Sequence, residues 1–170
     1  MEMRFLLDTD IFIYIRQKRP EDVSRRFRKL HPGEAGISII TYGELLYGAA
    51  KSVRRADALA RLSALIDLLP VLPLEEGAAH AYSEIRAELE SNGEMIGNND
   101  LWIAAHVLAA GLILVTNNER EFRRYVASRC RIGLNSKISR ANTATLYISP
   151  WFTMNCFTAL ISSATDWRNL

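Results

Sequence analysis

The sequence is poor in the residues that build zinc sites and disulfide frameworks. Its 170 residues include two cysteines, Cys130 and Cys156, and three histidines, with no CxxC pair and no cysteine-histidine cluster. These absences argue against a structural zinc site and against a disulfide-stabilised scaffold. We therefore expect reduced thiols in a cytoplasmic protein.

The sequence also lacks a long apolar run and a strong excess of charge of one sign. No segment has the length and apolarity of a membrane span, and Met1 leads directly into a charged residue and a short strand, so neither a membrane helix nor a signal peptide is expected. The formal net charge is only +2, which excludes the overall basic field of many nucleic-acid-binding proteins. Basic residues cluster within 16–29 and 51–61, where solvated helix faces are the simplest interpretation.

Short apolar segments alternate with helical patterns through most of the chain, and 49% of the residues are apolar, enough for one full core. Strands are predicted near 5–7, 37–40, 71–74 and 112–115, with helices near 21–30, 53–69, 75–92, 100–110 and 119–126. This alternation predicts a three-layer α/β fold, with a central, mostly parallel sheet of four to five strands and helices on both faces.

The segment from Ile96 to Asn118 combines an almost wholly apolar helix with a strand. The helix carries Asp100 in its first turn and ends at Gly111, so it should be packed inside the domain with Asp100 at the rim of the core. An acid in a first turn also complements the helix dipole, which is a purely structural alternative.

Two other acids occupy comparable positions. Asp8 follows the buried strand 5–7, where open α/β sheets place their ligands, and capping of the next helix is the alternative role. Asp10, two residues later, is a weaker candidate. Glu44 falls three residues after Thr41, which is the spacing of a capping box. Capping alone would explain this pair without any chemistry.

Asp8, Glu44 and Asp100 can nevertheless meet, because the strands of a parallel sheet have their carboxyl ends at one edge. Three carboxylates at one place repel each other and are stable together only around a cation. Oxygen ligands without histidine or cysteine select Mg²⁺ or Mn²⁺. No pair among the three histidines has metal-ligand spacing, so each is expected to be a helix-face residue.

Four segments occur in the order found in a known family: LLDTD, TYGELLYGA, GNNDLWIAAHVLAAG and LVTNNEREF. Together they resemble the PIN-domain ribonucleases, and most closely the VapC toxins of toxin-antitoxin pairs, over residues 4–131. The resemblance implies a PIN-like fold and a metal-dependent endoribonuclease in which Asp8, Glu44 and Asp100 hold Mg²⁺. It also implies that a metal-activated water cuts the RNA phosphodiester, leaving a 3′-hydroxyl and a 5′-phosphate.

The last segment departs from the family pattern. Family members commonly carry an aspartate two residues after the threonine, whereas here Asn118 follows Thr116. Glu121 is the available carboxylate, so a fourth catalytic acid would be Glu121, or Asn118 would hold a water.

Parts of the sequence also fit two other functions. Asp8-Thr9-Asp10 also fits the start of a haloacid-dehalogenase-type phosphatase, but that pattern needs Thr or Val where Phe12 stands, and no lysine motif follows. A PIN-like module that only binds RNA or protein would suit a site that had lost an acid, whereas all three principal acids are present.

The resemblance further implies an RNA substrate such as tRNA or rRNA, a cognate antitoxin and a homodimer. The antitoxin groove is expected at residues 14–30 and 47–62, and the dimer interface on helices 53–69 and 75–90, which are rich in leucine and alanine. Residues 1–132 form the expected nuclease domain. Residues 133–170 have only four charged residues, which indicates either a frameshifted or replaced end or an extension whose apolar residues pack on the domain or a partner.

Overall fold

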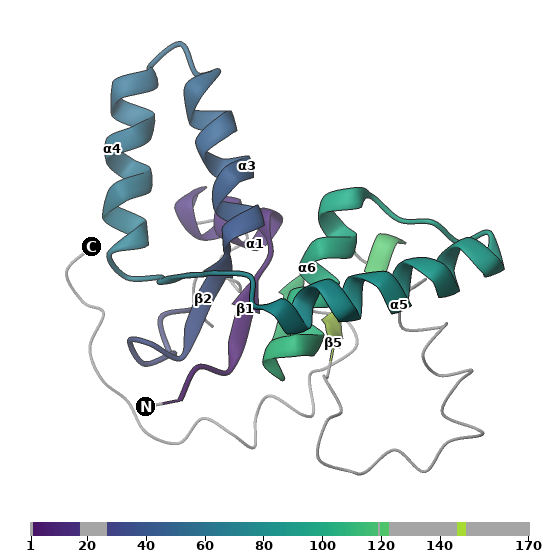
Figure 1. The fold of residues 1–170 in the computed structure, drawn as a ribbon. Coiled ribbons are helices and arrows are strands. Elements are labelled where there is room, and N and C mark those ends of the chain that lie inside the picture. The colour runs from purple at the N-terminus through teal and green to yellow at the C-terminus, as the bar shows by residue number, and fades with distance from the viewer. Residues whose placement is uncertain (1, 18–26, 119, 123–145, 149–170) are drawn as a thin grey trace.

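Five parallel strands form one sheet in the order β3-β2-β1-β4-β5 (Figure 1). The computed structural model describes residues 2–17, 27–118, 120–122 and 146–148. The strands are β1 (Phe5–Leu7), β2 (Ala35–Ser38), β3 (Val71–Leu72), β4 (Ile113–Thr116) and β5 (Leu146–Ile148). Every pairing is parallel, so all carboxyl ends lie at one edge. The predicted α/β fold with a parallel sheet of four to five strands is confirmed.

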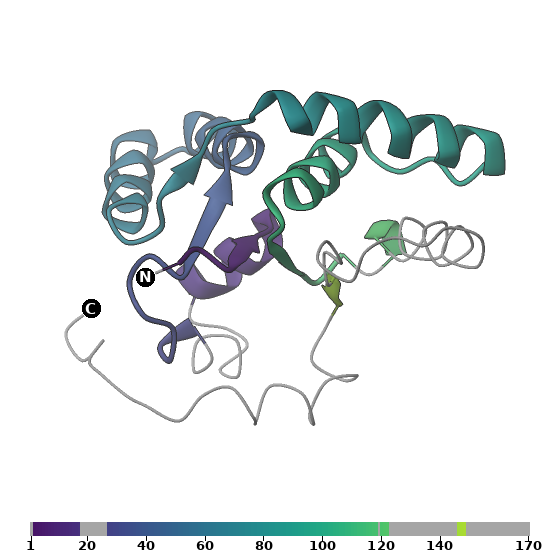
Figure 2. The same cartoon turned by 60° about the horizontal axis from the view of Figure 1, so that its bottom comes forward.

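Helices cover both faces of this sheet. The helices are α1 (Thr9–Gln17), α3 (Ile39–Ala50), α4 (Arg55–Ile66), α5 (Glu76–Asn92) and α6 (Asn98–Ala110). Figure 2 shows α5 and α6 together on one side of the sheet and α1 on the other, while α3 and α4 pack as a helical pair. The strand β1 is buried between these layers: Leu6 packs with the α5–α6 core, and Phe5 and Leu7 pack with the α1–α4 core. All residues of β1 are apolar because helices cover the sheet on both faces, so side chains on either side of the strand are buried.

The start of α3 differs from the sequence prediction. Ile39 and Ile40 were assigned to the second strand and Thr41 to the helix cap, whereas β2 ends at Ser38 and α3 begins at Ile39. The Ser38 side chain caps the helix by accepting a hydrogen bond from the Ile40 backbone N–H at 3.2 Å. The prediction was wrong because one apolar run continues from a strand into the first turn of a helix, and composition does not mark the change.

Thr41 is consequently a fully buried residue inside α3, and its hydroxyl has no hydrogen-bond partner within the described ranges. A buried hydroxyl without a partner costs free energy that an apolar group of the same shape does not. We expect Thr41→Val to raise the free energy of unfolding by about 1 kcal/mol, measured by urea denaturation. A loss of about 1 kcal/mol would instead restore the capping interpretation.

The remaining boundaries agree with the sequence to within a few residues. Helices α5 and α6 end at Gly93 and Gly111, both left-handed at φ 65° and 64°, a conformation that glycine adopts without strain. The third strand stops at Leu72, two residues early. The predicted helix 21–30 lies mostly outside the described residues. Of helix 119–126, residues 120–122 are helical, with Phe122 fully buried as expected.

The C-terminal part of the chain contributes β5. Leu146 and Ile148 pair with Leu114 and Thr116 of β4, so this segment extends the sheet. The other tail residues lie outside the described ranges, and the division of the chain at residues 132 and 133 stays a prediction.

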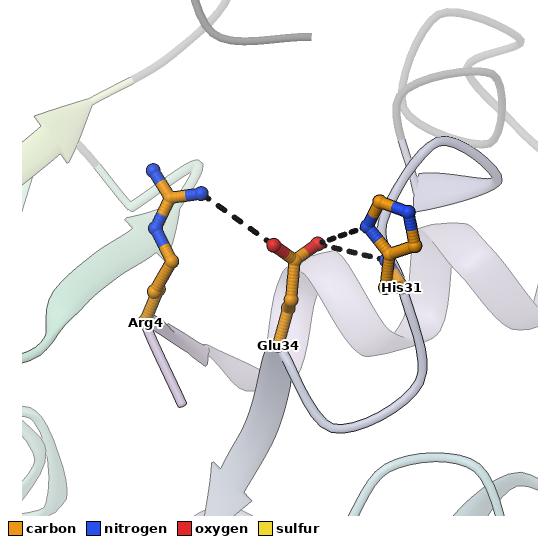
Figure 3. A network of polar contacts seen from close by, with 3 residues as sticks. All are labelled: Arg4, His31 and Glu34. Atoms are coloured by element: carbon orange, nitrogen blue, oxygen red, sulfur yellow. Dashed lines mark hydrogen bonds and ion pairs between the residues drawn. The ribbon is translucent and has the colours of Figure 1, made fainter. Parts of the chain in front are cut away.

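At the amino ends of β1 and β2, Glu34 joins two segments (Figure 3). Its carboxylate accepts hydrogen bonds from the His31 backbone N–H at 2.8 Å and lies 3.5 Å from the Arg4 guanidinium. The His31 backbone bond, more than the Arg4 charge, lowers the pKa of Glu34. This carboxylate lies at the edge opposite the carboxyl ends of the strands, so it supports the fold and is no part of the acid cluster.

Exposed large apolar side chains lie on α3 and in the segments that follow α3 and α5. In the described part of the chain they are Ile39, Leu46, Tyr47, Val53 and Met95. Helices α4 and α5 show none, because their leucines are at least partly buried. Alanines of both helices are nevertheless exposed, namely Ala56, Ala60, Ala64, Ala79 and Ala87, so the dimer interface expected there stays a prediction. Within the same ranges, no helix has both the length and the apolarity that a membrane span needs.

Candidate active site

Asp8 stands directly after β1 and is only 4% exposed. Its Oδ2 accepts a hydrogen bond from the Thr116 hydroxyl at 2.6 Å, and its Oδ1 accepts one from the Thr9 backbone N–H at 2.7 Å. Burial nevertheless raises the pKa of Asp8 above its usual value, since desolvation outweighs these two donors. The fold thus holds the Asp8 carboxylate at the sheet edge, where burial makes its ionised form less stable than it is in water.

Glu44 reaches the same region from α3. Because α3 begins at Ile39, Glu44 lies in the second turn, and the predicted capping box does not form. Its Oε2 accepts a hydrogen bond from the Thr9 hydroxyl, and its Oε1 accepts one from the Asn99 side-chain amide at 2.8 Å. Both donors come from other elements, which indicates that Glu44 is oriented toward the sheet edge rather than along its own helix.

Asp100 occupies the first turn of α6, as predicted. Its Oδ1 accepts a hydrogen bond from the Asn118 side-chain amide at 3.2 Å. Its Oδ2 lies so close to Gly97 that a Cβ at that position would be only 2.5 Å away. Burial first, then the charges of Asp8 and Glu121, raise the pKa of Asp100 to about 6. Structural capping does not account for an acid that is destabilised in this way.

The three predicted acids share one electrostatic field. The charges of Asp8 and Glu44 both raise the pKa of Asp100, and Glu44 also raises that of Asp8. The charge of Asp10 raises the pKa of Asp8 more than the charge of Glu44 does. Within the described ranges, no three acidic, histidine or cysteine side chains lie close enough together to enclose a metal ion as they stand. The acids are thus near enough to repel one another, while Thr9 and Asn99 hold the Glu44 carboxylate.

Two residues bear on the fourth acid. Glu121 is half-buried in the helical turn 120–122, and its charge raises the pKa of Asp100. Asn118 stands where the family commonly has an aspartate, and it donates to Asp100 instead of adding a further negative charge. An amide here reduces the repulsion at the site, because it replaces a like charge by a hydrogen-bond donor.

Sequence reasoning missed the hydrogen-bond donors around the acids. Thr9 follows Asp8, and Asn99 precedes Asp100. This position next to a candidate acid was the only feature of the sequence that could have marked them as donors. In the sequence, Thr116 had no role beyond marking the family motif. Its hydroxyl donates a hydrogen bond to Asp8 and accepts one from the Asn118 backbone N–H at 2.9 Å. Gly97 carried no signal beyond its place in a turn.

His106 is a residue of α6, as predicted, and it is buried, only 3% exposed. Its Nδ1 lies 3.0 Å from the Ser38 hydroxyl, the group that caps α3. Burial lowers the pKa of His106, and the Glu75 charge acts against this more weakly. The histidine therefore joins α6 to the start of α3 in its neutral form.

The lowered pKa predicts acid sensitivity. The unfolded chain takes up the His106 proton near pH 6.5, whereas the folded protein resists it. Neutral His106 therefore contributes its full share of the free energy of unfolding above pH 6.5. That contribution is lost as the pH falls toward the pKa of His106 in the folded protein. We expect wild type to lose a few degrees more of melting temperature than His106→Asn between pH 7.5 and 5.5. Equal losses in differential scanning fluorimetry would contradict this.

Comparison with known proteins places the chain in a family. The PIN domain model matches residues 5–127. Ribonuclease VapC2 of Haemophilus influenzae is 40% identical over 127 residues, which are 75% of this chain and 96% of the relative. The tRNA(fMet)-specific endonuclease VapC of Shigella flexneri is 41% identical, over 72% of this chain and 92% of that protein. The structure of VapBC2 from Rickettsia felis bound to a promoter DNA fragment matches with a TM-score of 0.70 and 30% identity, covering 87% of this chain and all of that one. The chain belongs to the PIN domain family, together with the VapC ribonucleases.

Proposed function

We propose that this protein is a Mg²⁺- or Mn²⁺-dependent endoribonuclease and the toxin of a toxin-antitoxin pair. The observation that carries the proposal is the mutual repulsion of Asp8, Glu44 and Asp100 at one sheet edge, in a chain about 40% identical to VapC ribonucleases. Acids whose charge is costly in the free protein are what a divalent cation neutralises. The donor set is all oxygen, which fits Mg²⁺ or Mn²⁺.

Asp8, Asp100 and Glu44 would hold the cation, with Glu121 beside them. When bound, such a cation acidifies a coordinated water and offsets charge on the scissile phosphate. The chain supplies the orientation of the carboxylates: Thr116 and the Thr9 backbone hold Asp8, Asn118 holds Asp100, and each carboxylate keeps a lone pair for a ligand. Donors of this kind fix the direction of metal ligands.

Metal dependence is the direct test. Purified protein treated with EDTA should leave RNA intact, and added Mg²⁺ or Mn²⁺ should restore cleavage with 5′-phosphate ends, checked by gel electrophoresis and end mapping. Ca²⁺, which prefers larger and more flexible coordination, should restore little. Cleavage that is indifferent to EDTA would refute the proposal and favour a contaminating metal-independent ribonuclease.

We infer that the substrate class is structured RNA with an accessible single-stranded loop, with tRNA the first candidate. The support is the Shigella relative, which is named as a tRNA(fMet)-specific endonuclease. Proteins read RNA sequence mainly in unpaired loops, where the bases are accessible. Incubation with total RNA, followed by mapping of the new 5′ ends, would distinguish cleavage of tRNA from cleavage of rRNA.

We further propose a cognate antitoxin as a partner, since the solved relatives are VapBC structures. A homodimer is proposed from the family resemblance alone. The exposed Ile39, Leu46 and Tyr47 on α3 support an apolar contact there, and Tyr47 lies within the predicted antitoxin segment. Expression of this chain alone should stop growth, and co-expression of its antitoxin should restore it. Light scattering should give twice the monomer mass for the free toxin.

A further inference from the structure

Thr9 contacts two of the three acids with two different atoms. Its backbone N–H donates to Asp8 Oδ1 at 2.7 Å, and its hydroxyl donates to Glu44 Oε2. Asp8 ends β1, whereas Glu44 belongs to α3, 35 positions from Thr9. One residue therefore ties together carboxylates that the sequence places on separate elements.

The two hydrogen bonds differ in kind. The backbone bond to Asp8 joins adjacent residues at the start of α1, and any residue other than proline could make it. The hydroxyl bond depends on the threonine side chain and fixes the position of a distant carboxylate. Only this second bond is open to a substitution that leaves the backbone unchanged.

The hydroxyl leaves Glu44 able to bind a cation. The Asn99 amide holds Oε1 and the Thr9 hydroxyl holds Oε2, so each oxygen accepts one of these bonds. A carboxylate oxygen has two lone pairs, and one therefore remains on each atom. Since Asp8 and Glu44 already repel each other, a neutral donor between them also offsets part of the cost of bringing them together.

We propose that Thr9 is a positioning residue of the active site, whose hydroxyl sets the Glu44 carboxylate relative to Asp8 and thereby strengthens divalent-cation binding. This inference rests on the proposed function. The Thr9 hydroxyl acts through Glu44, which it contacts. A donor of this type commonly contributes about 10- to 100-fold in metal affinity.

Thr9→Val tests the hydroxyl alone, because valine keeps the branched shape and the backbone donor. We expect Mn²⁺ affinity, measured by titration calorimetry without RNA, to fall about 10-fold or more. Thr9→Ser, which keeps the hydroxyl, should stay within about 3-fold of wild type. Thr41→Val is the matched control: it makes the same change at a buried hydroxyl that has no partner in the described ranges, and its Mn²⁺ affinity should equal that of wild type.

The RNA-cleavage rates separate positioning from a structural role. Raising the Mn²⁺ concentration should restore much of the Thr9→Val rate, because the defect lies in cation binding. Equal Mn²⁺ affinity in wild type and Thr9→Val, or an equal loss in Thr9→Ser, would overturn the inference. Thr9→Ala replaces Thr9→Val in the same comparison if circular dichroism shows that the valine variant is unfolded. Wild type that binds no Mn²⁺ would refute the proposed function itself.

Discussion

Replacement of Asp100 by asparagine is expected to abolish RNA cleavage while making the metal-free protein more stable. The activity should fall by about 10³-fold or more, since several kcal/mol of charge stabilisation depend on the bound cation. The stability should rise because burial and the charges of Asp8 and Glu121 raise the pKa of Asp100 to about 6. Asparagine removes this repulsion and can still accept the Asn118 hydrogen bond. As Asp100 is only partly buried, we expect a gain of about 1 kcal/mol after solvent screening.

Cleavage assays measure the loss of activity in Asp100→Asn, and urea denaturation of the same preparation measures its gain in stability. Asp8→Asn and Glu44→Gln should also lose cleavage, with the fold retained by circular dichroism. Glu84→Gln is the matched control, because it removes an exposed carboxylate from α5 and should leave both quantities near wild type. An Asp100→Asn protein that cuts RNA at the wild-type rate would show that the assigned site is wrong.

Gly97→Ala is expected to lower cleavage about 10- to 100-fold with no loss of helix. The backbone at Gly97 (φ −55°, ψ 143°) suits any residue, so alanine causes no strain in the chain itself. A methyl group there would stand 2.5 Å from Asp100 Oδ2, and the carboxylate must move away. A displacement of about 1 Å at a catalytic group can cost about 100-fold in rate.

Cation affinity and cleavage should fall together in this variant, as measured by calorimetry and by RNA assays. Gly48→Ala is the control, since a Cβ at that helical position meets nothing within 4 Å and alanine favours the helix. If Gly97→Ala keeps wild-type affinity and rate, the position of the Asp100 carboxylate is not limiting.

Local sequence patterns by themselves determined the succession of strands and helices along the chain as far as β4, and two of the helix ends. The apolar strand at 5–7, the buried helix with Asp100 in its first turn, and the glycine stops at Gly93 and Gly111 all depend on residues close in the chain. Their physical causes, burial periodicity and backbone preference, act within one or two turns. The three candidate acids were visible for the same reason, because each stands at an end or in an early turn of a predicted element.

Only the tertiary structure decided which groups surround those acids. The donors to Glu44 lie 35 and 55 positions away, and the donor to Asp100 lies 18 positions away. Such partners depend on how strands pair and helices pack, which no local pattern encodes. The start of α3 was also decided there, because Ser38 is held between the Ile40 backbone and the buried His106. Burial and the charges of neighbouring acids, rather than local propensity, thus raise the pKa values of Asp8 and Asp100, while mostly long-range hydrogen bonds orient the carboxylates.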